Sequence, residues 1–201
     1  MSIAVEGLPE LRWTHRSGVA EVVAGGIRLT AAAGTDWSND AAGDGNPVDN
    51  LSTSLSFEPG AGDFQFSARV EVRAPRTTFD AAVLTVWADD RHWAKLCFEQ
   101  SPQQEAMVVS VVTDGFSDDA NGAPIEGDAV WLRISRIGAA FAFHYSLDGS
   151  VWRFARLFRL DLTHDPLVGL MAQAPHGDRA VTTFTHVSFD RRTLHDLRAG
   201  D

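Results

Sequence analysis

The chain has 201 residues, of which 44% are hydrophobic, and this is enough apolar material to bury a full core in one domain. Its 27 acidic residues outnumber its 17 lysines and arginines, which gives a formal net charge of -10. Nucleic-acid backbones and anionic membranes favour clustered positive charge, so we expect neither as a partner. No apolar run approaches the roughly 20 residues that a membrane helix needs. We therefore expect a single domain over residues 1–201.

Cysteine usage and the N-terminal sequence both bear on location. The one cysteine, Cys97, cannot form a disulfide within the chain. The first residues, MSIAVEGLPELRW, lack the charged segment and long apolar segment of a signal peptide. Both features favour the cytoplasm, where thiols stay reduced.

Short runs rich in Val, Phe, Trp and Thr alternate with Gly and Pro along the whole chain, at a spacing of roughly 10–15 residues. This spacing is typical of an all-β, antiparallel sandwich. The polar segments 35–50 and 116–128 are expected to be irregular, and 191–201 a short helical turn or a loose tail. The expected strands are 11–15, 20–24, 27–31, 52–58, 64–73, 82–88, 92–100, 106–114, 130–137, 141–147, 151–160, 168–174 and 182–190.

Tight turns are expected between several of these strands. Gly25-Gly26 supplies the positive φ that a two-residue hairpin turn needs. Asp89-Asp90-Arg91 would connect two long strands, and Asp148-Gly149 is a strong turn signal. These turns join neighbours in sequence, which favours antiparallel pairing.

The run His92–Gln100 is the most informative segment, because side chains along a strand point alternately to opposite faces. One face would be wholly apolar and suited to a core: Ala94, Leu96 and Phe98. The other would carry an aromatic ring, a cation, a thiol and a carboxylate: Trp93, Lys95, Cys97 and Glu99. A strand with a merely solvated back seldom places a tryptophan there, so we interpret this second face as part of a binding surface.

Six runs in the same order resemble a family of small bacterial and fungal proteins of unknown function, sometimes labelled "regulation of enolase" after one member. The resemblance covers roughly residues 10 to 190. The runs are Thr35-Asp36-Trp37, Trp93-Ala94-Lys95 with Glu99, Ser110-Val111-Val112-Thr113 with Ser117-Asp118, Trp131-Leu132-Arg133, Tyr145-Ser146 with Asp148-Gly149 and Trp152, and Val168-Gly169 with Gln173-Ala174-Pro175 and Gly177.

The family belongs to the concanavalin A-like lectin/glucanase superfamily. The resemblance therefore implies a two-sheet antiparallel jelly-roll sandwich with a concave ligand face, and it implies no known reaction. This sequence departs from the family at one point. Relatives commonly have a glutamine soon after the aspartate that matches Asp80, whereas here Ala81-Ala82 follows it. Any ligand contact made by that glutamine is missing or replaced.

The leading hypothesis is a carbohydrate-binding surface with no catalytic pair. Trp37 and Trp93, together with Trp87 or Trp131, would stack on sugar rings, while Trp13 and Trp152 are assigned to the core. Polar side chains next to these tryptophans would form hydrogen bonds with the sugar hydroxyls. The polar candidates are Asp36, Lys95, Glu99, Arg133, His144 and Gln173.

One alternative is an enzyme acting on a glycoside or sugar metabolite, with Glu99 as acid or base. Superfamily hydrolases use two carboxylates, but the strand offers Lys95, Cys97 and Glu99, so only one acid remains. Asp36 or Asp118 could supply the second from elsewhere. Lys95 and Glu99 lie roughly 13 Å apart along an extended strand, which is too far for a direct bond.

Two further interpretations remain open. Lys95 and Glu99 could belong to a purely structural ion-pair network, and the polar face could dock another protein. Oxygen-rich loops at Asp40–Asn50 and Asp118–Asn121 do not match a twelve-residue calcium loop, so we assign no metal and no cofactor. The sequence leaves the oligomeric state undetermined.

Overall fold

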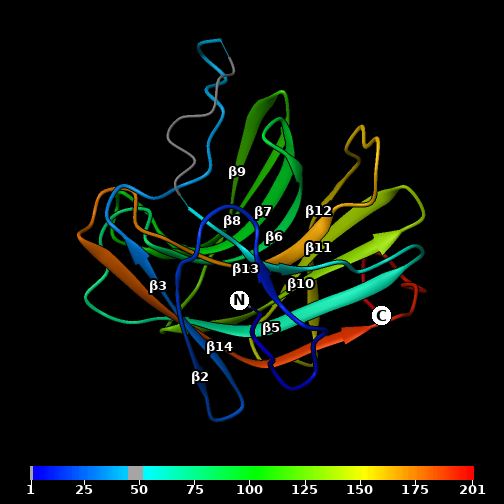
Figure 1. Ribbon diagram of the computed structural model, residues 1–201, viewed down its shortest axis with the longest axis horizontal. Coiled ribbons are helices and arrows are strands. Elements are labelled where there is room, and N and C mark those ends of the chain that lie inside the picture. The colour runs from blue at the N-terminus through cyan, green and yellow to red at the C-terminus, as the bar shows by residue number, and fades with distance from the viewer. Residues whose placement is uncertain (1, 45–51) are drawn as a thin grey trace.

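Fourteen strands and no helix make up the described part of the chain, residues 2–44 and 52–201 of a computed structural model. They form two antiparallel sheets of seven strands each, packed as a sandwich (Figure 1). The all-β prediction and the two-sheet jelly-roll prediction are both confirmed. No helix among the described residues is long and apolar enough to cross a membrane.

The first sheet carries the candidate site. Its strands from edge to edge are β1 (Arg12–Trp13), β4 (Leu55–Phe57), β13 (Leu167–Gln173), β6 (Ala81–Asp89), β7 (His92–Gln100), β8 (Ala106–Asp114) and β9 (Phe116–Pro124). The second sheet contains β12 (Trp152–Phe158), β11 (Ala140–Ser146), β10 (Ala129–Ile137), β5 (Phe64–Val72), β14 (Arg179–Asp190), β3 (Gly26–Ala32) and β2 (Val19–Val23).

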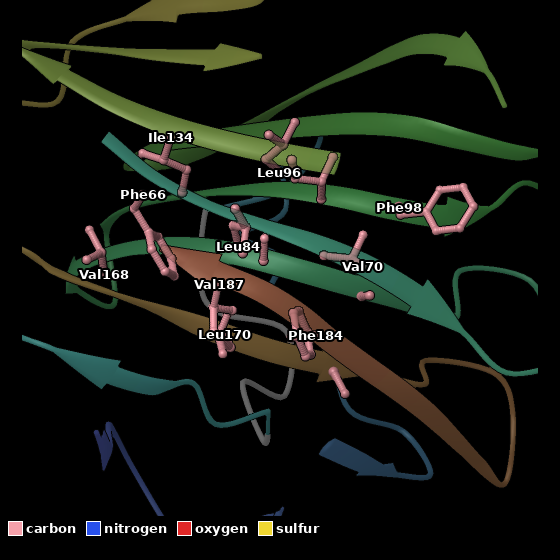
Figure 2. Packing of buried hydrophobic residues seen from close by; sticks show 14 of the residues in the cluster. Phe66, Val70, Leu84, Leu96, Phe98, Ile134, Val168, Leu170, Phe184 and Val187 are labelled. Carbon is pink, nitrogen blue, oxygen red and sulfur yellow. The ribbon is translucent and has the colours of Figure 1, made fainter. Parts of the chain in front are cut away.

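The core lies between the sheets, where both contribute every second side chain. Leu96 and Phe98 of β7 point into it from the first sheet, and Phe66, Val70 and Phe184 enter from the second (Figure 2). All five side chains are fully buried, with an exposed fraction of 0%. Burying a side chain of this size contributes about 1.5–3 kcal/mol, so this interior holds the two sheets together.

Residues 116–124 correct one prediction, because they form the edge strand β9 and are not irregular. The strand is held by its main chain, which pairs with β8 from Asp114–Phe116 to Met107–Pro124. Seven of its nine residues are exposed, and four of the nine are polar: Ser117, Asp118, Asp119 and Asn121. A strand of this kind leaves no alternation of apolar and polar residues, which is why the sequence pattern did not reveal it.

The C-terminal residues 191–201 form no helix, but one turn closes within them, where the Gly200 N–H donates to the Asp196 carbonyl at 2.8 Å. The Arg133 guanidinium donates a 2.6 Å hydrogen bond to the Gly200 carbonyl. His144 Nε2 donates to the Leu197 carbonyl at 2.8 Å. Leu194 is buried. The segment is therefore fixed against the outer face of the second sheet.

Candidate functional site

The expected alternation along β7 is confirmed. Leu96 and its apolar neighbours belong to the core between the sheets. Trp93 and Cys97 belong to a second apolar cluster on the opposite side. We call that side, the face of the first sheet turned away from the second sheet, the open face.

A chain of four polar side chains lies on the open face. Lys95 Nζ donates to Asp36 Oδ1 at 2.6 Å and to Gln173 Oε1 at 3.1 Å. Gln173 Nε2 donates in turn to Glu99 Oε2 at 3.2 Å and to the Phe79 carbonyl at 3.0 Å. Gln173 thus bridges Lys95 and Glu99, which form no direct hydrogen bond with each other. We call these four side chains, from Asp36 to Glu99, the polar network.

Strand register explains how Gln173 reaches Glu99. Gln173 of β13 pairs with Ala81 of β6, and Ala81 pairs with Glu99 of β7, so the three residues lie in one row across adjacent strands. Because the side chain of Ala81 is only a methyl group, it leaves space on the open face of β6 between Gln173 and Glu99. The long side chain of Gln173 crosses that space, which a larger residue at position 81 would fill.

The polar network borders a cavity of about 520 Å³. Its wall includes Asp36, Lys95, Glu99 and Gln173 together with Gly34, Ser38, Phe79, Val109, Val111, Asp119, Asn121, Pro175 and His176. Phe79 has a positive φ of 68°, a conformation that is uncommon for a bulky residue. Its ring lies 5.3 Å from that of His176. The cavity therefore combines an aromatic wall with charged and amide groups.

Burial governs the electrostatics of this cavity. It raises the pKa of Glu99 to about 7; Lys95 opposes that rise, while Asp36 and Asp119 add to it. Burial also raises the pKa of Asp119. For Lys95, burial is the largest single influence and would lower the pKa, but Asp36, Cys97 and Glu99 together outweigh it, and the pKa lies above the usual value. Lys95 is thus a permanent cation, whereas Glu99 changes charge near neutral pH.

Trp37 and Trp93 do not expose the ring faces that stacking on a sugar would require. Each is 1% exposed, and their rings meet edge to face with centroids 5.7 Å apart. The Trp37 indole N–H is bonded to the Ser52 carbonyl at 3.0 Å. The predicted stacking role is therefore wrong, because both rings pack beneath the polar network and Lys95 Nζ lies 5.9 Å from the Trp93 ring.

Arg133 and His144 are not part of the site. They are register partners on β10 and β11 of the second sheet, beneath the C-terminal segment. The prediction that they share a face with Lys95 is wrong, because side-chain alternation shows which residues share a face of a strand but not which sheet the strand joins. Trp131 lies on β10 as well, and its ring is 5.1 Å from His186.

Sequence reasoning missed several residues of the cavity wall. Asp119 and Asn121 lie two apart on β9 and so share a face of that strand. Asp118, considered earlier as a second acid, instead pairs with Arg156 at 3.1 Å. Recognising β9 as a strand would have identified Asp119 as the better candidate.

No group of three or more His, Cys, Asp or Glu residues within 2–44 and 52–201 could hold a metal ion. Asn46, Asp49 and Asn50 of the oxygen-rich loop lie outside the described residues.

Comparisons with known proteins add to this geometry. A family model described as "Protein of unknown function (DUF1349)" matches residues 13–192. A functionally unknown protein from Saccharomyces cerevisiae has a similar structure, with 26% identity and a TM-score of 0.80, over 92% of this chain and 97% of that chain. No curated protein matches the chain.

Carbohydrate-active proteins share the fold at lower identity. The GH43 protein BlXynB from Bacillus licheniformis is 15% identical with a TM-score of 0.64, over 83% of this chain and 33% of that one. An alginate lyase from Klebsiella pneumoniae is 13% identical with a TM-score of 0.57, over 88% and 85% of the two chains. At these identities the likeness shows the fold alone, and none of these matches supports the label "regulation of enolase".

Proposed function

Because the chain belongs to that family of proteins of unknown function, its role must come from its own site, and we propose that it binds a saccharide in the cavity beside Lys95 and Glu99. The observation that carries this proposal is the polar network, a hydrogen-bonded set of four side chains that borders an open cavity and of which three are buried.

The size and chemistry of the cavity support a small polar ligand. A volume of about 520 Å³ lies within the range of about 300–1,000 Å³ typical of small-molecule sites. Sugar hydroxyls both donate and accept hydrogen bonds, so they match a wall that carries carboxylate, amide and ammonium groups.

An apolar wall faces these polar groups. Phe79 and His176 form a tilted ring pair, and Pro175, Val109 and Val111 complete the same lining. The C–H face of a sugar ring packs against such a surface. This aromatic pair takes the part that the sequence assigned to Trp37 and Trp93.

The polar network is also organised before a ligand arrives. Both Lys95 and Gln173 are buried, and Lys95 makes two hydrogen bonds while Gln173 makes three. Side chains already fixed in place lose little conformational entropy on binding, which favours affinity. The carbohydrate-active proteins that share the fold add weight to this choice of ligand, although they are too distant to transfer a function.

A matched pair of histidine variants tests the proposal. His176→Ala removes an exposed ring from the cavity wall, whereas His164→Ala removes an exposed ring that does not line it. We expect an oligosaccharide array to identify binders, and calorimetry to show about threefold to tenfold weaker binding for His176→Ala alone. Equal affinity of both variants, or an array without any binder, would contradict the proposal.

A second candidate function is hydrolysis or another acid–base reaction on a sugar. The observation that favours it is Glu99, whose pKa of about 7 is suited to proton transfer at neutral pH. Asp36 and Asp119 line the same cavity and are the available second carboxylates. Release of products from oligosaccharides by the wild type, lost in Glu99→Gln, would establish this activity; saccharide binding without turnover would exclude it.

A further inference from the structure

We propose that the saccharide bound in this cavity carries a protonated amine, which Glu99 and Asp119 hold. The inference rests on the proposed saccharide-binding function and names the class of sugar that the site prefers.

The wall of the cavity has more hydrogen-bond acceptors than its own donors occupy. Gln173 uses both N–H groups on Glu99 and Phe79, and its oxygen accepts from Lys95. Among the described residues, Glu99 Oε1 receives no hydrogen bond, although Glu99 is only 8% exposed and lines the cavity. Asp119 likewise has no hydrogen bond or ion pair within the described ranges. The cavity therefore offers open acceptor atoms to which a ligand can donate.

Carboxylates outnumber cationic side chains in the lining of the cavity. Three carboxylates line the cavity, those of Asp36, Glu99 and Asp119, and Lys95 is the one lysine or arginine in the described lining. Lys95 is already bonded to Asp36 at 2.6 Å. An ammonium group on the ligand would offset the remaining negative charge, whereas a uronate or phosphate would add to it. The net charge of -10 favours the approach of a cation as well.

Because Glu99 is buried, we expect a strong preference for an amine over an uncharged group at this position. A hydrogen bond between a buried carboxylate and an ammonium is roughly twice as strong as one between neutral groups. A hydroxyl or an N-acetyl group in the same place would donate without the charge. We therefore expect an amine to be preferred by about tenfold over its acetylated counterpart.

The site also links binding to pH. An ammonium favours ionised Glu99, and the pKa of this buried group is about 7, so affinity should rise as pH increases through neutrality until the ligand loses its own proton. The titratable and polar groups around Glu99 come from five parts of the fold. They are Lys95 and Cys97 on β7, Asp119 on β9, Gln173 on β13, and Asp36 and His176 in the adjoining segments.

The test compares three sets of probes by calorimetry: glucosamine oligosaccharides, the same oligosaccharides fully N-acetylated, and oligogalacturonates. Wild-type protein should bind the amines about tenfold more tightly than the acetylated forms, and the uronates least. Asp119→Asn should remove most of that preference without weakening the acetylated forms. Asp118→Asn is the matched control, because its carboxylate lies one residue away, pairs with Arg156 and does not line the cavity.

The outcomes separate this inference from the function on which it rests. Acetylated or uronate probes that bind as well as the amines would overturn the amine preference and leave saccharide binding intact. Equal preference in Asp119→Asn and wild type would overturn the assignment of Asp119. Binding of no saccharide, in any probe set or on the array, would overturn both proposals.

Discussion

Gln173 donates a 3.2 Å hydrogen bond to Glu99, although the two residues belong to strands β13 and β7, which are separated by β6. The contact exists because Ala81 occupies the intervening row position. In this chain the glutamine that meets Glu99 comes from β13, at the place where Ala81 leaves room for it.

Enlarging Ala81 should break this contact. In Ala81→Leu, the added carbons occupy the space that the Gln173 side chain crosses, and overpacking of a buried site typically costs about 1–3 kcal/mol of unfolding free energy. Saccharide affinity should fall along with stability. Urea unfolding and calorimetry would measure both, with Ala120→Leu on exposed β9 as the control that changes neither. Unchanged affinity in Ala81→Leu would show that the Gln173–Glu99 contact does not shape the site.

Removing the buried cation should destabilise the fold. Lys95→Met leaves Asp36 without its ion-pair partner and Glu99 without its nearest positive charge. Breaking a fully buried pair costs about 3–5 kcal/mol, and we expect the lower end because the Asp36 side chain is 29% exposed.

The control for that experiment is Arg156→Met, which breaks an ion pair with Asp118, whose side chain is 74% exposed. It should cost less than about 1 kcal/mol. Chemical unfolding of both variants against wild type gives the comparison, and similar losses in the two would contradict a special role for Lys95.

Glu99 should make stability depend on pH. Its pKa rises from 4.5 to about 7 in the fold, so the folded state binds a proton that the unfolded state has already released between these values. This contribution is fully present below about pH 4.5 and is lost as pH rises through about 7, by about 3 kcal/mol in all. Glu99→Gln does not titrate. Its stability relative to wild type should therefore increase between about pH 5 and about pH 8, and a constant difference across that range would contradict the raised pKa.

The C-terminal segment should matter for stability and not for binding. Gly200 has a φ of 76°, and an added Cβ would lie 2.7 Å from Cβ of Trp152. Gly138→Ala is a matched control, because Gly138 has a φ of 58° with nothing within 4 Å of an added Cβ. Gly200→Ala should lower the melting temperature more than Gly138→Ala does, while saccharide affinity stays at the wild-type level in both. Loss of affinity in Gly200→Ala would indicate that the segment reaches the site.

Local patterns predicted the fold and one strand of the site, because they depend on alternation within a single segment. The separation of Leu96 and Phe98 from Lys95 and Glu99 is a property of β7 alone. Gln173 was also expected on the same face as Lys95, and in the structure Lys95 Nζ donates to Gln173 Oε1 at 3.1 Å.

The remaining residues depend on relations between distant segments, which alternation does not encode. Arg133 has the same local appearance as a site residue, yet β10 pairs with β5 and β11 in the second sheet. Trp93 lies on the open face as expected, but Trp37, from 56 positions earlier in the chain, covers it. Asp119 escaped notice because β9 is held by main-chain bonds and its polar side chains resemble those of a loop.

The most direct test of saccharide binding on the open face uses the indole N–H signals of the tryptophans in a heteronuclear NMR titration with glucosamine oligosaccharides. Trp93 lies beside Lys95, and its indole N–H has no hydrogen-bond partner in the described structure, whereas Trp152 stacks on Arg133 against the second sheet. We predict that the Trp93 and Trp37 signals shift with saturation while the Trp152 signal stays in place. A saturable shift of Trp152 alone, or no shift at Trp93 at any ligand concentration, would contradict the account.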